Sequence, residues 1–171
     1  TAISVLREMG VLLTAILVAG RSGSSFAAEI GVMKLNDEVD ALKTLGIDPF
    51  EVLIVPRIIA LVIALPLLTF IADICGLVGG ALMSVTILDI PLNSYFTQVL
   101  SAVSMSDFVV GMIKAPVFAF IIASVGTFRG MQATGSAESV GRLTTIAVVQ
   151  SIFLVILADA FFSIMFAKLG F

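Results

Sequence analysis

Histidine and tryptophan are absent from this sequence of 171 residues, and cysteine occurs once. The lack of histidine excludes imidazole catalysis and metal sites that are built from histidine, so we expect neither a bound metal nor a cofactor in this chain. A single cysteine excludes a disulfide within the chain. Cys75 lies in an apolar run, where it is expected to pack as a small hydrophobic residue.

Charged residues are also scarce: they make up 12% of the sequence, while hydrophobic residues make up 60%. Soluble domains carry about 25% charged and about 45–50% apolar residues. The composition therefore predicts an integral membrane protein with little room for a soluble domain. The net charge of -3 offers no basic surface, which argues against a nucleic-acid partner.

Four apolar stretches are long enough to cross a bilayer, because about 20 helical residues span roughly 30 Å of hydrocarbon. They predict an all-α integral membrane protein with one transmembrane domain over 1–171. The expected spans are about 3–28, 50–84, 107–128 and 143–167. Between the second and third spans, residues 85–106 are expected to form an excursion outside the membrane.

Lysine and arginine set the expected orientation, since loops rich in these residues face the cytoplasm. Lys34 and Lys43 lie in the first connection, and Arg129 and Arg142 flank the third, whereas residues 85–106 contain neither lysine nor arginine. The first and third connections are therefore predicted to be cytoplasmic, and residues 85–106 to face the opposite, periplasmic side.

A short amphipathic helix is predicted at about 36–45, because apolar residues there recur at helical spacing. Asn36 or Asp37 is expected to cap its start. Gly46 suits the position after its end, and Pro49 prevents it from continuing. The apolar stripe consists of Leu35, Val39, Leu42 and Leu45.

The polar face of this helix is acidic, with Asp37, Glu38 and Asp40. Helices that lie on a membrane surface usually carry lysine and arginine there, so lipid attraction explains this helix poorly. An ordinary interfacial loop helix remains one interpretation. The other is a coupling helix, which in an ABC transporter permease fits into a cleft of the ATPase. Its candidate coupling residues are Asp37, Glu38, Asp40, Leu42 and Leu45.

Five charged residues are expected at one level near the periplasmic side: Arg7, Glu8, Asp107, Lys114 and Asp159. Charged side chains within membrane spans are costly and mark functional sites by default. Lys114 and Asp159 lie at similar helical distances from Arg129 and Arg142, so they can pair. The cluster either fixes the helix register or binds a phospholipid headgroup, with the cations meeting the phosphate and the acids meeting an amine.

Three further charges are assigned structural roles. Arg21 and Glu29 are eight residues apart on one helix face and are expected to brace the short helix. Arg57 can extend its side chain to the cytoplasmic surface. Asp73 is expected near the far interface, in contact with solvent.

Two sequence blocks carry a family resemblance: "REMGVLLTAILVAGRSGSSFAAEIG" at 7–31 and "DEVDALKTLGIDPFEVLIVPR" at 37–57. They closely resemble the MlaE permease family, the membrane subunits of MCE-associated ABC transporters for phospholipids. The resemblance continues through "ALPLLT", "GMIKAPVFA" and "LADAFF" and covers nearly the whole chain. Departures are small: Met9 replaces the usual leucine, Val11 stands where proline is common, and Ser22 replaces a small apolar residue.

The resemblance implies a bacterial inner-membrane permease that is not itself an enzyme. A complete subunit would have five spans, and this chain would hold the last four, without the N-terminal interfacial helix and first span. The implied partners are a second permease copy, an ABC ATPase dimer that uses ATP and magnesium, a STAS-type regulator bound to the ATPase, and a periplasmic hexamer of MCE proteins. Phospholipid would bind near the periplasmic side, between the two permeases.

Two other classes of function are less well supported by the same residues. A membrane enzyme would need a nucleophile with a base or a metal cluster, and an ion-coupled carrier would use Lys114 and Asp159 as a relay. Carriers often show inverted repeats, and none is apparent here. ATP hydrolysis by this chain is not expected, because it lacks a glycine-rich Walker motif. A sterol or another lipid remains an alternative cargo.

Overall fold

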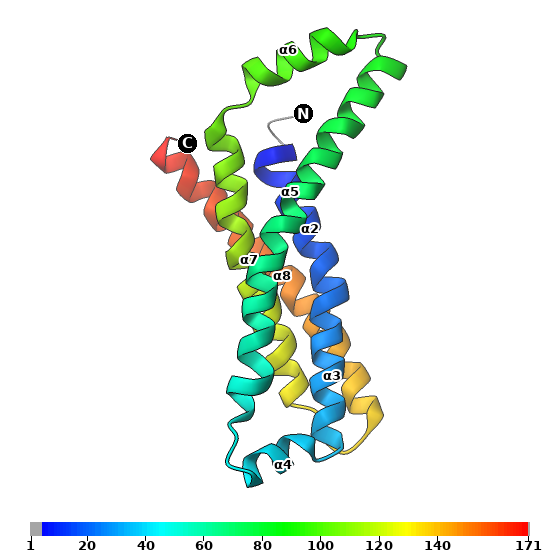
Figure 1. Cartoon of the computed structure of the whole chain (residues 1–171), viewed down its shortest axis with the longest axis vertical. Coiled ribbons are helices and arrows are strands. Elements are labelled where there is room, and N and C mark those ends of the chain that lie inside the picture. Colours follow the sequence, from blue (N-terminus) through cyan, green and yellow to red (C-terminus); the bar gives the residue numbers. More distant parts are fainter. Residues whose placement is uncertain (1–4, 171) are drawn as a thin grey trace.

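The computed structural model describes residues 5–170 and shows a bundle of long helices (Figure 1). Within those residues every regular element is helical. Four helical segments are long and apolar enough to cross a membrane: Val5–Leu35, Phe50–Thr86, Met105–Met131 and Ala137–Leu169. The prediction of an all-α membrane protein with four spans is therefore confirmed.

The first span is one continuous helix with two π-helical turns. It runs through η1 (Val5–Met9), α2 (Gly10–Val18), η2 (Ala19–Gly23) and α3 (Ser24–Leu35). Its predicted start at residue 3 lies outside the described residues. Its end lies seven residues beyond the predicted residue 28, because Ile30 and Gly31 pack inside the bundle and extend the buried face.

The second span begins with η3 (Phe50–Ile54) and continues as α5 (Val55–Thr86), and the helix continues through Pro66. Before it, α4 (Glu38–Thr44) lies across one end of the bundle. After it, α6 (Leu92–Ala102) lies across the opposite end (Figure 1). These two ends are called the α4 end and the α6 end below.

The last two spans are α7 (Met105–Met131) and α8 (Ala137–Leu169). Helix α8 begins six residues earlier than the predicted residue 143. Val140 and Leu143 pack with Ala133 and Leu35, so the first turns of α8 are held against the end of α3. The polar connection between the spans is correspondingly short, and Arg142 lies on a helix.

Helix α7 lies at the centre of the bundle, in contact with α2, α3, α5 and α8. Small residues let its neighbours approach closely, as is usual between membrane helices. A Cβ on Gly126 would lie 2.7 Å from the carbonyl oxygen of Gly23. The main core cluster surrounds Phe118 and Ile122 of α7, with Val11 from α2, Leu65 from α5 and Val155 from α8.

Charged residues mark two levels along the first span. Glu8 and Glu29 lie on the same continuous helix, 21 residues apart, which corresponds to roughly 30 Å at about 1.5 Å per residue. That is the thickness of one hydrocarbon core. Each glutamate pairs with a cation from another helix, Lys114 and Arg57 respectively. We therefore place the two borders of the membrane at these levels.

Candidate functional site

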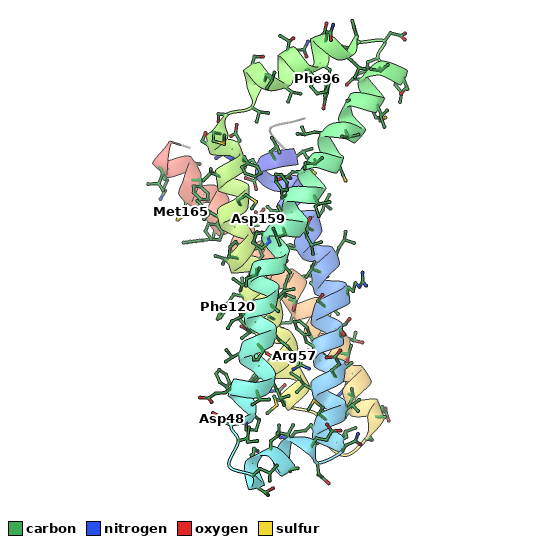
Figure 2. All side chains as sticks on the ribbon, in the orientation of Figure 1. Asp48, Arg57, Phe96, Phe120, Asp159 and Met165 are labelled. Carbon is green, nitrogen blue, oxygen red and sulfur yellow. The ribbon has the colours of Figure 1, made fainter. Side chains whose placement is uncertain are left out.

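The site forms where η1, α7 and α8 meet, toward the α6 end of the bundle, near the position of Asp159 in Figure 2. Lys114 is fully buried on α7, with 0% of its surface exposed. Its ammonium nitrogen donates to Glu8 Oε2 at 2.7 Å and to Asp159 Oδ1 at 2.9 Å. The expected pairing of Lys114 with Asp159 is confirmed, and Glu8 is a second direct partner.

Gly111 on α7 allows η1 to approach α7 closely enough for Glu8 to reach Lys114. A Cβ on Gly111 would overlap the backbone carbonyl oxygen of Leu6. Because Gly111 lies three residues before Lys114, the contact places Glu8 directly beside the lysine. Any side chain at position 111 would push η1 away from α7.

Arg7 joins the cluster through two acids. Its guanidinium lies 3.8 Å from Glu8 and 3.5 Å from Asp107. Asp107 has another role, because it forms a capping box at the start of α7 with Ser104: its Oδ2 accepts hydrogen bonds from the Ser104 backbone N–H and hydroxyl, at 3.1 and 3.0 Å. Asp107 therefore fixes the start of α7 and also holds Arg7.

Two serines complete the site, and neither was identified from the sequence. Ser163 donates its hydroxyl to the Glu8 carboxylate at 3.3 Å, and Ser104 caps α7. A signal for Ser163 was present: it lies four residues after Asp159 and hence on the same face of the helix. A signal for Ser104 was its spacing of three residues before Asp107.

The cluster combines two cations, Arg7 and Lys114, with three carboxylates. Burial of unpaired charges in a membrane is costly, and here the pairing offsets that cost. The Arg7 and Glu8 side chains keep 23% and 33% of their surface exposed, whereas Lys114 is enclosed. Arg7 and Glu8 are thus the accessible members of this part of the cluster, while Lys114 holds the acids in position.

At the opposite border, Glu29 pairs with Arg57, a contact that was not predicted from the sequence. Glu29 Oε2 lies 3.1 Å from the Arg57 guanidinium, and Ser25 donates to the other carboxylate oxygen. Arg57 also donates to the Leu53 carbonyl at 2.7 Å and lies over the Phe26 ring. Arg57 therefore links the first two spans rather than simply reaching toward solvent.

Arg21 and Asp73 also differ from expectation. Arg21 lines a separate recess between the first span and α5, together with Ser22 and Leu68. Asp73 is 2% exposed instead of solvated, because it packs against Gly10, where a Cβ would overlap its Oδ1. Among residues 5–170 that oxygen has no hydrogen-bond partner.

Helix α4 lies across the α4 end of the bundle and joins the first two spans (Figure 1). Val39 is fully buried and Leu42 half-buried, whereas Leu45 is 73% exposed. The acidic side chains of Asp37, Glu38 and Asp40 are exposed. Val39 and Leu42 therefore attach α4 to its own bundle, whereas Leu45, the last residue of the apolar stripe, faces outward with the acids.

The ends of α4 are only partly as predicted. Gly46 has φ of 74°, its N–H binds the Lys43 carbonyl at 3.0 Å and the N–H of Ile47 binds the Leu42 carbonyl at 3.0 Å. These bonds form a Schellman motif and confirm the predicted C-terminal glycine. Asp37 occupies the N-cap position in the left-handed region, with φ of 58°, and its side chain makes no cap hydrogen bond. The prediction of a side-chain cap by Asp37 is therefore wrong.

Together, the fold and these charged groups define a multi-pass membrane protein with ionic contacts at both borders and an acidic helix across one end. Residues 1–165 match the family described as Permease MlaE. The chain belongs to this family of ABC transporter permeases.

Curated relatives agree with this assignment. A probable ABC transporter permease protein of Rickettsia prowazekii is 40% identical over 166 residues, which cover 97% of this chain and 64% of the relative. A protein of the same description from Synechocystis is 38% identical over 169 residues, 98% of this chain and 64% of the relative. The chain thus spans less than two thirds of the length of these relatives.

A plant relative is similar over a comparable region. The Arabidopsis thaliana protein trigalactosyldiacylglycerol 1, chloroplastic, is 41% identical over 153 residues, which cover 90% of this chain and 44% of the relative.

Proposed function

We propose that the chain forms most of the permease subunit of an ABC transporter that moves phospholipids between the inner and outer membranes of a bacterium. The lipid headgroup binds at the cluster of Arg7, Glu8, Asp107, Lys114 and Asp159, on the periplasmic side. A separate ATPase drives transport, so this subunit carries out no chemical reaction of its own.

The ion pairs around Lys114 carry this proposal. They place cations and carboxylates at one membrane border, and both kinds of group are needed for a zwitterionic headgroup. Arg7 can bind a phosphate, and Glu8 can accept a hydrogen bond from an amine. The plant relative supports a lipid cargo, because its name is that of a galactolipid.

Helix α4 supports the link to an ATPase. Its apolar side is used inside the bundle, and its acidic side is exposed at the end opposite the charged cluster. A basic or mixed cleft on an ATPase dimer would complement Glu38 and Asp40. The complete assembly would contain two permease copies, with the lipid pocket between them, a STAS-type regulator on the ATPase and a hexamer of MCE proteins in the periplasm.

The test is lipid binding and transfer by the full-length complex with Arg7→Ala or Glu8→Ala. Phospholipid that co-purifies with the complex is measured by mass spectrometry, and ATP-driven lipid transfer is measured in proteoliposomes. Both variants are expected to lose bound phospholipid and transfer while the complex still assembles, because these two side chains are the accessible ones.

Lys168→Ala is the matched control, since it removes a cation from an exposed position near the end of α8. It is expected to behave as the wild type. Normal lipid content and transfer in both Arg7→Ala and Glu8→Ala would contradict the proposal and leave the cluster with a purely structural role.

A further inference from the structure

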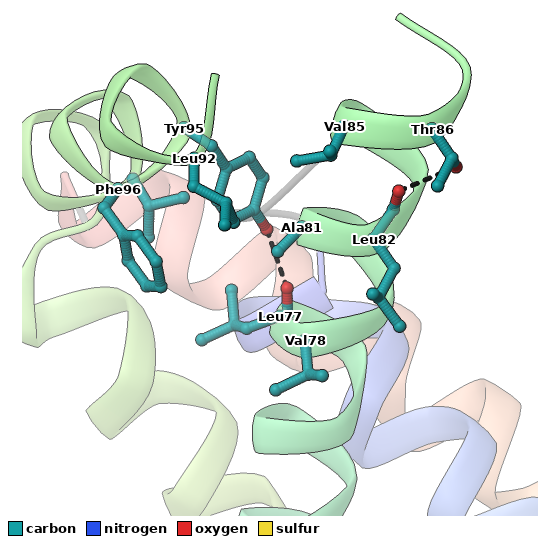
Figure 3. Close-up of a pocket in the computed structure, with 10 residues that line it drawn as sticks. Leu77, Val78, Ala81, Leu82, Val85, Thr86, Leu92, Tyr95 and Phe96 are labelled. Carbon is teal, nitrogen blue, oxygen red and sulfur yellow. Dashed lines mark hydrogen bonds between the residues drawn. The ribbon is translucent and has the colours of Figure 1, made fainter. Parts of the chain in front are cut away.

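A cavity separate from the charged cluster lies at the α6 end of the bundle, between the last turns of α5 and helix α6 (Figure 3). Its volume is about 440 Å³. The lining side chains come from the two helices alone and are almost all hydrophobic: Leu77, Val78, Ala81, Leu82, Val85 and Thr86 from α5, and Leu92, Tyr95, Phe96 and Val99 from α6. We call it the α5–α6 pocket.

The pocket lies beyond the membrane border that the charged cluster marks. Starting from Arg57 at the opposite border, about 20 residues of helix cross the hydrocarbon core, so α5 reaches the far border near Leu77. The contact of Gly10 with Asp73 gives a similar level for this border. Gly10 lies two residues from Glu8, which marks the border, and Asp73 lies four residues before Leu77 on α5. The rest of α5, up to Thr86, extends roughly 13 Å farther at about 1.5 Å per residue.

The polar groups of the pocket are already satisfied within the protein. The Tyr95 hydroxyl donates to the Leu77 carbonyl at 2.9 Å, and the Thr86 hydroxyl donates to the Leu82 carbonyl at 2.8 Å (Figure 3). These bonds leave the lining without a free donor for a phosphate, a sugar or an extended peptide backbone. The chemistry therefore suits an alkyl chain.

The pocket has the right size for one such chain. An apolar protein cavity of about 150 Å³ holds benzene, which has six carbon atoms. A cavity of about 440 Å³ is three times larger and has room for roughly 18 carbon atoms by the same ratio. Leu82 and Phe96 remain 63% and 56% exposed, so a chain could enter from the side. An apolar patch of this kind outside a membrane usually marks a binding site.

We propose that the α5–α6 pocket binds one acyl chain of the transported lipid outside the hydrocarbon core. It is a second lipid subsite, distinct from the charged cluster in position and in chemistry: the cluster binds a headgroup, and the pocket binds a tail. The proposal rests on the proposed function, because it takes its ligand from lipid transport.

Gly80 gives the pocket its shape. A Cβ at this position would lie 2.8 Å from the Tyr95 hydroxyl oxygen, so the glycine lets Tyr95 reach the Leu77 carbonyl. The adjacent Gly79 faces open space. These two glycines provide a matched pair for mutation, because both lie in α5 and only Gly80 contacts a side chain that lines the pocket.

The experiment uses the full-length complex purified in detergent with a trace of phosphatidylethanolamine that carries a diazirine in the middle of one acyl chain. After irradiation, the cross-linked residues are identified by peptide mass spectrometry. We expect labels on Ala81, Val85 or Val99, inside the pocket. We expect no label on Met83, which lies on α5 but is not part of the lining. Excess unlabelled lipid should remove the pocket labels.

Ala81→Phe fills the pocket and should abolish labelling there, whereas Met83→Phe adds the same ring outside it and should not. Gly80→Ala, with Gly79→Ala as its control, should likewise reduce labelling by displacing Tyr95. If Ala81→Phe does not assemble, the competition with unlabelled lipid in the wild type and the glycine pair still decide the question.

The outcomes separate this inference from the proposed function. Phospholipid that co-purifies with the complex but gives no label in the pocket would overturn the acyl-chain subsite and leave the lipid permease standing. Equal labelling of Met83 and Ala81 would show contact with bulk lipid or detergent and would also overturn the acyl-chain subsite. The subsite would likewise be overturned if a second copy of the chain covered the pocket and prevented its labelling. Absence of both the pocket labels and co-purified phospholipid would contradict the proposed function itself.

Discussion

At the scale of single residues, Lys114 shows how a buried cation can be stable inside a membrane protein. Its ammonium group lies between two carboxylates from other helices, within 3 Å of each. Removal of one partner from a buried ion pair typically costs about 3–5 kcal/mol, because the remaining charge stays unpaired. Because the Glu8 side chain is 33% exposed, we expect removal of its carboxylate to cost about 3 kcal/mol, the lower end of this range.

An exchange of charges tests the Lys114–Asp159 pair. Lys114→Asp and Asp159→Lys should each lower the thermal unfolding midpoint of the full-length protein in detergent, since each places like charges together. The double exchange should recover part of the loss, because contacting residues typically couple by about 0.5–3 kcal/mol. Lys168→Asp, at an exposed position, is the control and should change the midpoint little. Additive effects of the two single variants would show that the residues do not interact.

The residues that sequence reasoning misplaced were those whose partners come from other helices. Helical rise was enough to set Lys114 and Asp159 at one depth, but rise says nothing of which side of a helix faces which neighbour. The pairing of Glu29 with Arg57, which lies on another span, was therefore not predicted. Asp73 is buried for a similar reason: Gly10 leaves space for it on the opposing helix, and that cannot be read from α5 alone.

At the scale of elements, α4 separates an inner from an outer face. Val39 is buried in the bundle, whereas Glu38, Asp40 and Leu45 point away from it. The sequence predicted this helix and the glycine that follows its end, because apolar periodicity and the preference for glycine at a positive φ are local properties. Which face meets a partner depends on packing against the bundle, and the structure buries Val39 and leaves the acids and Leu45 accessible.

Charge reversal on the outer face of α4 should detach the ATPase. Glu38→Lys with Asp40→Lys is expected to abolish co-purification of the ATPase, since both acids face outward and their reversal would repel a basic cleft. Glu138→Lys reverses one acid at the α4 end, on α8 instead of α4, and serves as the control. The measurement is the ATPase-to-permease ratio after affinity purification. An unchanged ratio in the double variant would rule out coupling through these acids.

The close contact of η1 with α7 can be tested at Gly111. Gly111→Ala would overlap the Leu6 carbonyl, so it should displace η1 and separate Glu8 from Lys114. We expect destabilisation by about 1–3 kcal/mol, as is typical for overpacking. Gly141→Ala faces open space within α8 and should instead stabilise by about 0.5–1 kcal/mol, because alanine favours helices. Thermal unfolding in detergent measures both variants, and equal midpoints would contradict the close contact.

At the scale of the whole molecule, two charged borders about one hydrocarbon thickness apart define how the bundle sits in a membrane. The number of spans could be predicted from hydropathy, because each apolar run satisfies its own backbone hydrogen bonds as a helix. Span ends were less predictable. Leu35 and Val140 lie outside the expected spans, and their packing with Ala133 and Leu143 extends two helices beyond the apolar runs.

The orientation of the two ends across the membrane can be tested without lipid or ATPase. In a full-length Cys75→Ser background, Leu45→Cys reports on the α4 end and Leu100→Cys on the α6 end, since these side chains are 73% and 80% exposed. Lysine and arginine gather at the α4 end, so it should face the cytoplasm. A membrane-impermeant maleimide added to intact spheroplasts should therefore label Leu100→Cys at once and Leu45→Cys only after permeabilisation. The Cys75→Ser parent gives the background. The reverse pattern would place α4 in the periplasm, out of reach of a cytoplasmic ATPase.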